Sequence, residues 1–252
     1  MKKLVLAISL LIFFSGISFG ATYKIDLIIG KVTLKQGSKS ISPSIGYILK
    51  KGDTIITGKD SECTIKISDK GLLKIEEQTT VTFDEIEKVA AGYKIDKISA
   101  KGNIIFSAQG VYSPKSRVTI KTETAFATVR GTEFILESDE QDTTVYTLEG
   151  SVLVAPAIPD IEYTKLIDSY SVDVNEDEKI TLSSLDVINA TTKFKEGEGI
   201  EFLKDKKQPL TEIEKQRYKK RLQMLKEIYK KRKSELQKKT KEYSKDIEKL
   251  FE

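Results

Sequence analysis

The 252-residue sequence contains no histidine and no tryptophan, and it has a single cysteine, Cys63. Without histidine the chain cannot build a Ser-His-Asp triad or a metal site with imidazole ligands. One cysteine excludes an internal disulfide and a zinc site made of several thiolates. Cys63, Ile65 and Ile67 alternate with polar residues, so they share one face of an expected strand. We therefore expect a buried, unreactive thiol, with an intermolecular disulfide as the alternative.

Glycine-rich phosphate-binding motifs and nucleophile motifs are also absent from the sequence. The strongest case for an enzyme is a pair of carboxylates acting on a glycan, for which the candidates are Glu133, Glu137, Asp139 and Glu140. Such clustering is ordinary for a strand followed by a loop, and tryptophan, a common platform for sugar stacking, is missing. We therefore expect a protein that is not an enzyme, without catalytic, cofactor-binding or metal-binding residues.

The N-terminus has the pattern of a secretory signal. Two lysines precede an apolar run, 4–19, which is shorter than the roughly 20 residues that a membrane-spanning helix needs. Ser18 and Gly20 supply the small residues of a cleavage site after Gly20. We expect residues 1–20 to be removed and the mature protein to be periplasmic or secreted. Nucleic acid is therefore not an expected partner.

Residues 21–156 contain short runs in which apolar and polar side chains alternate, for example 31–35, 80–84 and 117–121. A period of two indicates half-buried strands. Turn signals rich in glycine, aspartate and asparagine separate these runs. Many short strands between frequent turns predict a mainly β domain, either solenoid-like or a roll or sandwich.

A glycine stands directly before an expected strand at Gly30, Gly71, Gly102 and Gly150. The recurrence indicates a repeated turn–strand unit, although its spacing is irregular. It favours a solenoid-like roll over a regular sandwich.

Residues 157–207 carry weaker signals. Strand-like runs at 170–174 and 178–182 flank a turn at 175–177. We expect a small β extension followed by a linker.

Residues 208–252 predict a long helix, since a capping box joins Thr211 to Glu214 and no proline or glycine follows. This segment has 15 Lys or Arg against 8 Asp or Glu, a net charge of +7. Residues 21–207 carry −5, so the overall charge of +4 hides a strong segregation. The basic helix is either a solvated arm or a contact for an anionic surface.

Five residues of this helix recur at intervals of seven: Leu222, Tyr229, Leu236, Tyr243 and Leu250. Such spacing is typical of a coiled coil, here a weak one, and makes a weak homo-oligomer an option. The apolar stripe is narrower than the 100° or more that a core-facing helix shows. We expect a projecting helix that residues 21–200 do not need for folding. The alternative is that Leu222, Leu225, Ile228 and Tyr229 dock on the sheet and cover an edge strand.

Two segments, VRGTEF at 129–134 and LEGSVLV at 148–154, resemble the hallmark segments of the FecR domain. Upstream, 30–32 and 49–58 resemble the opening strand of that domain and its Gly-Asp…Thr turn. The resemblance covers roughly residues 28–155. The motif residues are Val129, Arg130, Gly131, Thr132, Phe134, Gly150 and Val152.

The residues of the motif suggest separate roles. Gly131 fits a position with positive φ or a close backbone approach. Phe134 is expected to anchor the core. Arg130 is expected to pair with an acidic neighbour, or to contact a ligand.

The resemblance implies a β-rich periplasmic module. In the best-known members, this module lies behind a membrane helix and a cytoplasmic anti-sigma domain, and it receives a signal from a siderophore transporter. Here a signal peptide stands where the cytoplasmic domain would be, so the transcriptional role is not carried over. We expect an exported, non-catalytic binding or scaffold module of the cell envelope, acting in signalling or assembly. Its partners would be an envelope protein or a polysaccharide such as peptidoglycan, and the alternatives are a glycan-active enzyme and a structural protein bearing a coiled coil.

Overall fold

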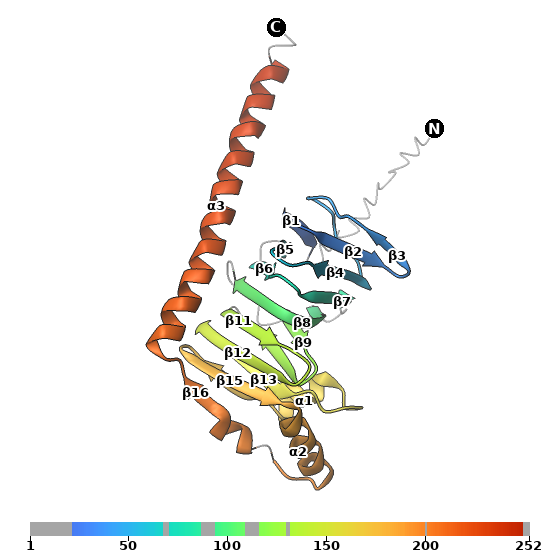
Figure 1. Cartoon of the computed structure of the whole chain (residues 1–252), viewed down its shortest axis with the longest axis vertical. Helices are drawn as coiled ribbons and strands as arrows, with labels where there is room; N and C mark the ends of the chain where they lie inside the picture. The colour runs from blue at the N-terminus through green and yellow to red at the C-terminus, as the bar shows by residue number, and fades with distance from the viewer. Residues whose placement is uncertain are drawn as a thin grey trace, which may run out of the picture.

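The computed structural model describes residues 22–67, 71–86, 94–108, 116–129, 132–199 and 201–248. The expected signal peptide, Arg130 and Gly131 lie outside these residues. Sixteen strands in the described part form one hydrogen-bonded system that folds into two layers, sheet A and sheet B. The prediction of a mainly β fold of short strands followed by a long C-terminal helix is confirmed (Figure 1).

The strands of sheet A are, from one edge to the other, β1 (Tyr23–Ile29), β5 (Glu62–Ile67), β6 (Gly71–Ile75), part of β8 (Lys94–Ala108), β11 (Glu133–Ser138), β12 (Asp142–Glu149), β15 (Glu178–Ser183) and β16 (Lys207–Pro209). Those of sheet B are β3 (Lys39–Ile41), β2 (Val32–Gln36), β4 (Asp53–Thr57), β7 (Thr80–Ile86), the rest of β8, β9 (Ser116–Lys121), β10 (Ala125–Val129), β13 (Ser151–Pro156) and β14 (Val172–Asn175).

Apart from β3, which pairs with the outer side of β2, both layers grow in chain order, as the colour gradient of Figure 1 shows. The chain therefore winds back and forth between the layers, and each new hairpin extends a sheet that is already present. Pairing between the described strands is antiparallel except between β8 and β9, which run parallel. The turn–strand units expected from the sequence are therefore arranged as a roll of two layers.

Strand β8 belongs to both layers. Residues 94–101 pair with β7 and β9 in sheet B, and residues 102–108 pair with β6 and β11 in sheet A. Gly102, at the crossing, has a φ of 114°. Because this backbone conformation is unfavourable for other residues, glycine allows one strand to leave one sheet and enter the other. Gly102 thus lies inside a strand and not, as expected, before one.

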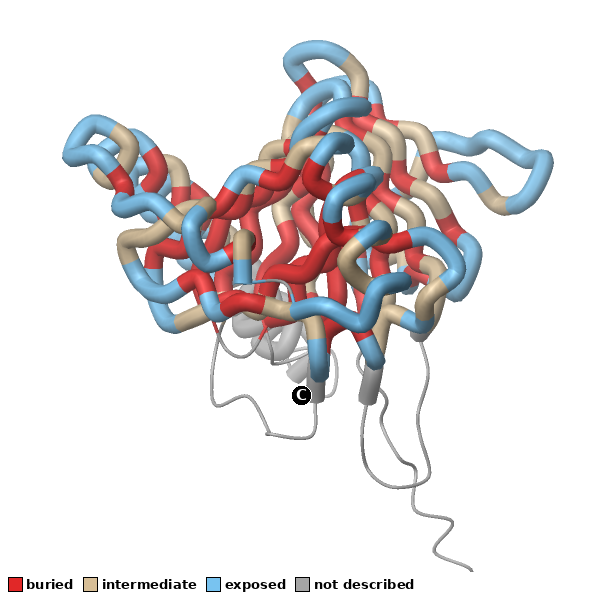
Figure 2. The backbone as a smooth tube through the Cα atoms, turned by 90° about the horizontal axis from the view of Figure 1, so that it is seen from below, coloured by how far each residue is buried: buried red, intermediate tan, exposed pale blue. Residues whose placement is uncertain are grey.

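The core lies between the layers, and Figure 2 shows the buried positions there, surrounded by exposed loops. Aromatic pairs anchor it: the ring centroids of Tyr23 and Phe83 are 5.4 Å apart, and those of Phe106 and Phe134 are 5.5 Å apart. Cys63 is fully buried, and burial raises the pKa of its thiol to about 12. The expectation of a buried thiol is confirmed.

The interval 157–207, expected to hold a small β extension and a linker, also contains helices α1 (Tyr163–Ser169), α2 (Ser184–Lys195) and a 3-10 turn, η1 (Glu201–Lys206). Helix α2 begins with a capping box between Ser183 and Asp186. Asp186 also accepts from Lys206 at 2.6 Å, which ties η1 to the start of α2. The two expected strands, β14 and β15, extend sheets B and A, so this interval completes the roll.

Helix α3 (Glu212–Glu248) begins after the predicted capping box, in which Thr211 N donates to Glu214 Oε2 at 2.9 Å. Its first half docks on the outer face of sheet A. Tyr218, Leu222 and Leu225 are buried there, against side chains of β6, β8, β11 and β12. The expectation of a fully projecting helix is wrong for this half, because three long side chains suffice to bury the apolar cluster Leu72, Ile105, Ile135 and Leu148 on the sheet. The alternative was also inexact, since the helix covers a face and not an edge strand.

Candidate ligand-binding groove

The described residues of the FecR-like motif serve the core. Val129 and Val152 are opposite each other on β10 and β13, and both are fully buried. Phe134 stacks on Phe106, and Gly150 adopts a φ of 78° in the turn between β12 and β13. Thr132 is buried as well, and its carbonyl accepts from Ala108 N at 3.2 Å. The possible ligand contact proposed for Arg130 lies outside the described residues.

The four candidate carboxylates take different partners. Glu133 accepts from Ser107 Oγ at 3.0 Å and pairs with Lys226 of α3 at 2.5 Å. Glu137 pairs with Arg221 of α3 at 2.8 Å. Asp139 caps a turn by accepting from Gln141 N and Asp142 N. Glu140 forms an exposed ion pair with Lys101. These contacts give Glu133 and Glu137 the role of holding a helix.

Charged pairs along α3 reinforce its apolar contact with sheet A. Arg221 bridges Glu137 and Glu76, and Lys179 of β15 pairs with Glu214 at 2.5 Å. Asp177 accepts from two further lysines of α3, each at 3.2 Å. The outer face of sheet A is therefore closed where α3 docks.

Acid pH is expected to loosen α3. The hydrogen bond from Lys179 holds the pKa of Glu214 below its usual 4.5, although burial opposes this shift. A carboxyl whose pKa is lower in the folded state contributes stability above its unfolded pKa and loses it as pH falls through the folded value. Urea unfolding at pH 7 and pH 3 should show lower stability in acid. The Glu214→Gln variant should lose less between the two pH values, and an equal loss in both proteins would contradict the role of this pair.

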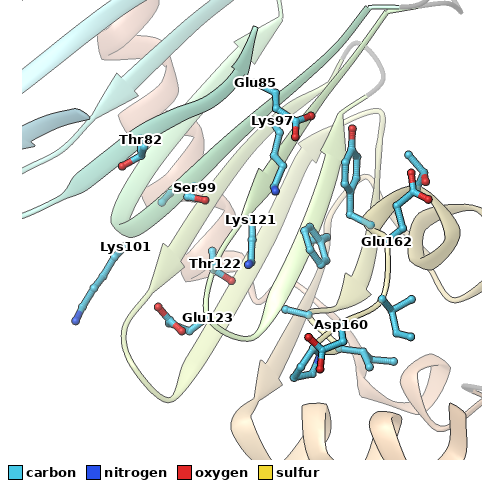
Figure 3. Close-up of a pocket in the computed structure, with 18 of the residues that line it drawn as sticks. Thr82, Glu85, Lys97, Ser99, Lys101, Lys121, Thr122, Glu123, Asp160 and Glu162 are labelled. Atoms are coloured by element: carbon cyan, nitrogen blue, oxygen red, sulfur yellow. The ribbon is translucent and has the colours of Figure 1, made fainter. Parts of the chain in front are cut away.

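The outer face of sheet B carries a groove of about 770 Å³. Its floor is formed by β7, β8, β9 and β10, and its wall by the loop 157–162 and the start of α1 (Figure 3). The loop is fixed at its base, because Ala157 N donates to Thr124 O at 3.0 Å. The loop that forms the wall is thus attached to the sheet that forms the floor.

One row of side chains crosses the floor. Strand pairing places Thr82, Ser99, Lys121 and Phe126 next to one another on β7, β8, β9 and β10. On β4 the row continues with Thr54, whose hydroxyl lies 2.9 Å from that of Thr82. Neighbouring strands are about 4.8 Å apart, so the row offers a new side chain at that interval.

Aromatic rings form one end of the groove. The ring centroids of Phe126 and Tyr163 are 6.0 Å apart, with an angle of 28° between the ring planes. Lys97 Nζ lies 5.7 Å from the centroid of Tyr163, and Lys121 Nζ lies 5.9 Å from that of Phe126. Within the described part of the chain, neither lysine forms an ion pair with a carboxylate. Each ammonium group therefore lies over an aromatic ring and can pair with the anionic group of a ligand.

The charge of the groove is mixed. Lys97, Lys101 and Lys121 line it together with four carboxylates: Glu85, Glu123, Asp160 and Glu162. Lys101 pairs with Glu140, and this hydrogen bond raises the pKa of its ammonium group. No group of three or more Cys, Asp or Glu residues suited to a metal ion occurs among the described residues.

Sequence patterns are sufficient to predict residues of the floor of the groove but not those of its wall. Alternation with buried Ile98 and Ile120 already places Ser99 and Lys121 on the outer face of their strands. The wall could not be found in this way, because residues 157–162 show no regular pattern and α1 was not predicted. Only the fold brings that loop to the floor.

A family model described as FecR protein matches residues 53–153, which run from the start of β4 into β13. Two crystal structures of a putative anti-sigma factor from Parabacteroides distasonis ATCC 8503, at 1.65 and 2.50 Å resolution, are similar to the chain. Each of these structures has 15% sequence identity to the chain and a TM-score of 0.40. The alignment covers 51% of this chain and 53% of the chain in the crystal structure. The chain thus spans about half the length of these structures.

No curated protein matches the chain. None of the helices in the described residues is both long and apolar enough to cross a membrane. The sequence motif, the matched residues and the mainly β architecture agree that residues 53–153 of the chain form a FecR domain.

Proposed function

We propose that the chain is an exported, non-catalytic binding or scaffold module of the cell envelope that acts in envelope signalling or assembly. The observation that carries this proposal is the contrast between the two outer faces of the roll. Helix α3 covers part of the face of sheet A and leaves a pocket of about 460 Å³ beside it, whereas the face of sheet B offers a polar groove of about 770 Å³. A binding module needs such a concave surface with converging polar groups.

The contacts of Glu133 and Glu137 argue against a glycan-active enzyme that uses these two carboxylates as its catalytic pair. Catalysis by a carboxylate pair requires two groups that face each other across the substrate, roughly 5–10 Å apart. Glu133 and Glu137 are instead engaged by Lys226 and Arg221 of α3. The proposal therefore assigns no catalytic residue, cofactor or metal to the chain.

Helix α3 suggests a second contact. Figure 1 shows it continuing well beyond the level of β1, and its sequence carries most of the excess positive charge. This part of the helix would meet an anionic surface, such as lipid headgroups or an anionic wall polymer. A coiled coil or weak homo-oligomer is proposed only for residues beyond Tyr229, since Leu222 and Leu225 already pack on sheet A.

Export is tested by fractionation of cells that express the full chain. We expect the protein in the envelope or the medium, with Ala21 as its first residue, because Ser18 and Gly20 fit a signal peptidase. As a control, Leu10→Arg interrupts the apolar run and should leave the uncleaved precursor inside the cell. Native protein that keeps Met1 and stays in the cytoplasm would remove the basis of the proposed function.

A further inference from the structure

We propose that the groove on sheet B binds an extended glycan strand that bears both carboxylate and amino groups, as peptidoglycan does through its stem peptides. This inference rests on the proposed function and names the ligand class of its groove. Four properties of the groove lead to it: the pairing of its floor, the spacing of its polar row, its mixed charge and its aromatic wall.

The floor excludes recognition by strand addition. Strands β7, β8, β9 and β10 each pair with neighbours on both sides, so their backbone N–H and C=O groups are already used. A peptide that adds a strand needs the free edge of a sheet. A ligand lying on this floor is held by the side chains of the floor strands, which suits a molecule with hydroxyl groups along its length.

The polar row matches an extended polymer. Thr82, Ser99 and Lys121 follow one another across three strands, at steps of about 4.8 Å. Such a step is close to the length of one sugar ring. A glycan lying across the strands would present hydroxyl groups to successive side chains of the row, and Ser99, whose own hydroxyl donates to Asp84, would accept from it.

The charge of the groove selects between polymers. Three lysines and four carboxylates line it, and Lys101 already pairs with Glu140, so the groove holds both signs with a small excess of negative charge. A uniform polyanion, such as a phosphate polymer, would meet more repulsion than attraction. A strand with both carboxylates and amines can pair with both signs, and Lys97 and Lys121 are left to receive its carboxylates.

The aromatic wall supplies an apolar surface. Tyr163 is half-buried on the side of the groove, with Phe126 stacked beside it. The flat face of a sugar ring is lined with C–H groups, which pack well on an aromatic ring. Tyr163 would therefore hold one sugar at the end of the row, in place of the tryptophan that the chain lacks.

The inference is tested by calorimetric titration of the mature full-length protein with soluble disaccharide–peptide oligomers from peptidoglycan. We expect binding, and a loss of affinity of at least tenfold in the double variant Lys97→Ala with Lys121→Ala, because both ammonium groups are removed. Tyr163→Ala should also weaken binding. The double variant Lys39→Ala with Lys59→Ala removes the same charge from exposed positions outside the groove and should bind like the wild type. Thermal melts of all variants show whether folding is kept.

Three outcomes would overturn the inference: no binding by the wild type, unchanged affinity in the folded Lys97 and Lys121 double variant, or equal affinity for dextran or polyphosphate. Failure here is separate from failure of the proposed function. A protein that is exported but does not bind the oligomers loses only the ligand class. A protein that remains in the cytoplasm loses the proposed function itself.

Discussion

A chain that ends at Leu210 is expected to aggregate or to lose its cooperative unfolding transition. Removal of α3 also removes Tyr218, Leu222 and Leu225, and it exposes the apolar side chains of sheet A on which they pack. Burial of each such side chain is worth about 1.5–3 kcal/mol. Since whole domains are stable by about 5–15 kcal/mol, the loss of three is a large fraction of the total. Urea unfolding of both proteins, followed by circular dichroism, measures the effect.

A chain that ends at Glu235 is the matched control. It keeps the docked half of α3 and should unfold at the same urea concentration as the full chain. Leu222→Ala in the full chain should cost about 2–5 kcal/mol, as for other buried leucines. If the chain ending at Leu210 stays soluble and unfolds like the full chain, α3 does not belong to the folded unit.

Gly102→Ala is expected to destabilise the protein by about 3 kcal/mol or more. A φ of 114° already costs about 1–3 kcal/mol for a residue with a side chain. The added Cβ would also lie 2.8 Å from Thr79 Cα and 2.4 Å from its Oγ1. Thr79 cannot move freely, because it is fully buried and its hydroxyl accepts from Asn103 N at 2.9 Å.

Gly37→Ala separates these two effects. Gly37 also has a positive φ, 59°, but nothing lies within 4 Å of the position of its Cβ. Its substitution should therefore cost only the backbone strain, about 1 kcal/mol. Equal stabilities for the two variants in chemical denaturation would show that the crossing of β8 is not closely packed.

The alternation of apolar and polar residues was enough to predict the β class and the buried face of Cys63. A period of two sets the face of a residue whatever its strand partner. The same pattern does not say which strands pair. The passage of β8 from one layer to the other at Gly102 therefore could not be predicted from the sequence.

Helices α1 and α2 were missed because their signals are local and weak. Helix α2 has a capping box at Ser183 and Asp186, but no clear apolar stripe follows it. The docking of α3 was misjudged for a related reason: its stripe is narrow, yet Tyr218 and Leu222 meet a face that is itself apolar. How many side chains a helix buries depends on the surface on which it packs. For α3 this surface is formed by four strands that only the fold brings together.

The claim that the groove of sheet B is the ligand face is tested most directly by lysine acetylation with and without saturating peptidoglycan oligomers. Mass spectrometry measures the modification of each lysine. The account predicts that Lys97 and Lys121 react several times more slowly in the complex, while exposed Lys39 and Lys230 react at unchanged rates. Protection confined to the lysines of α3, or absent from Lys97 and Lys121, would contradict it.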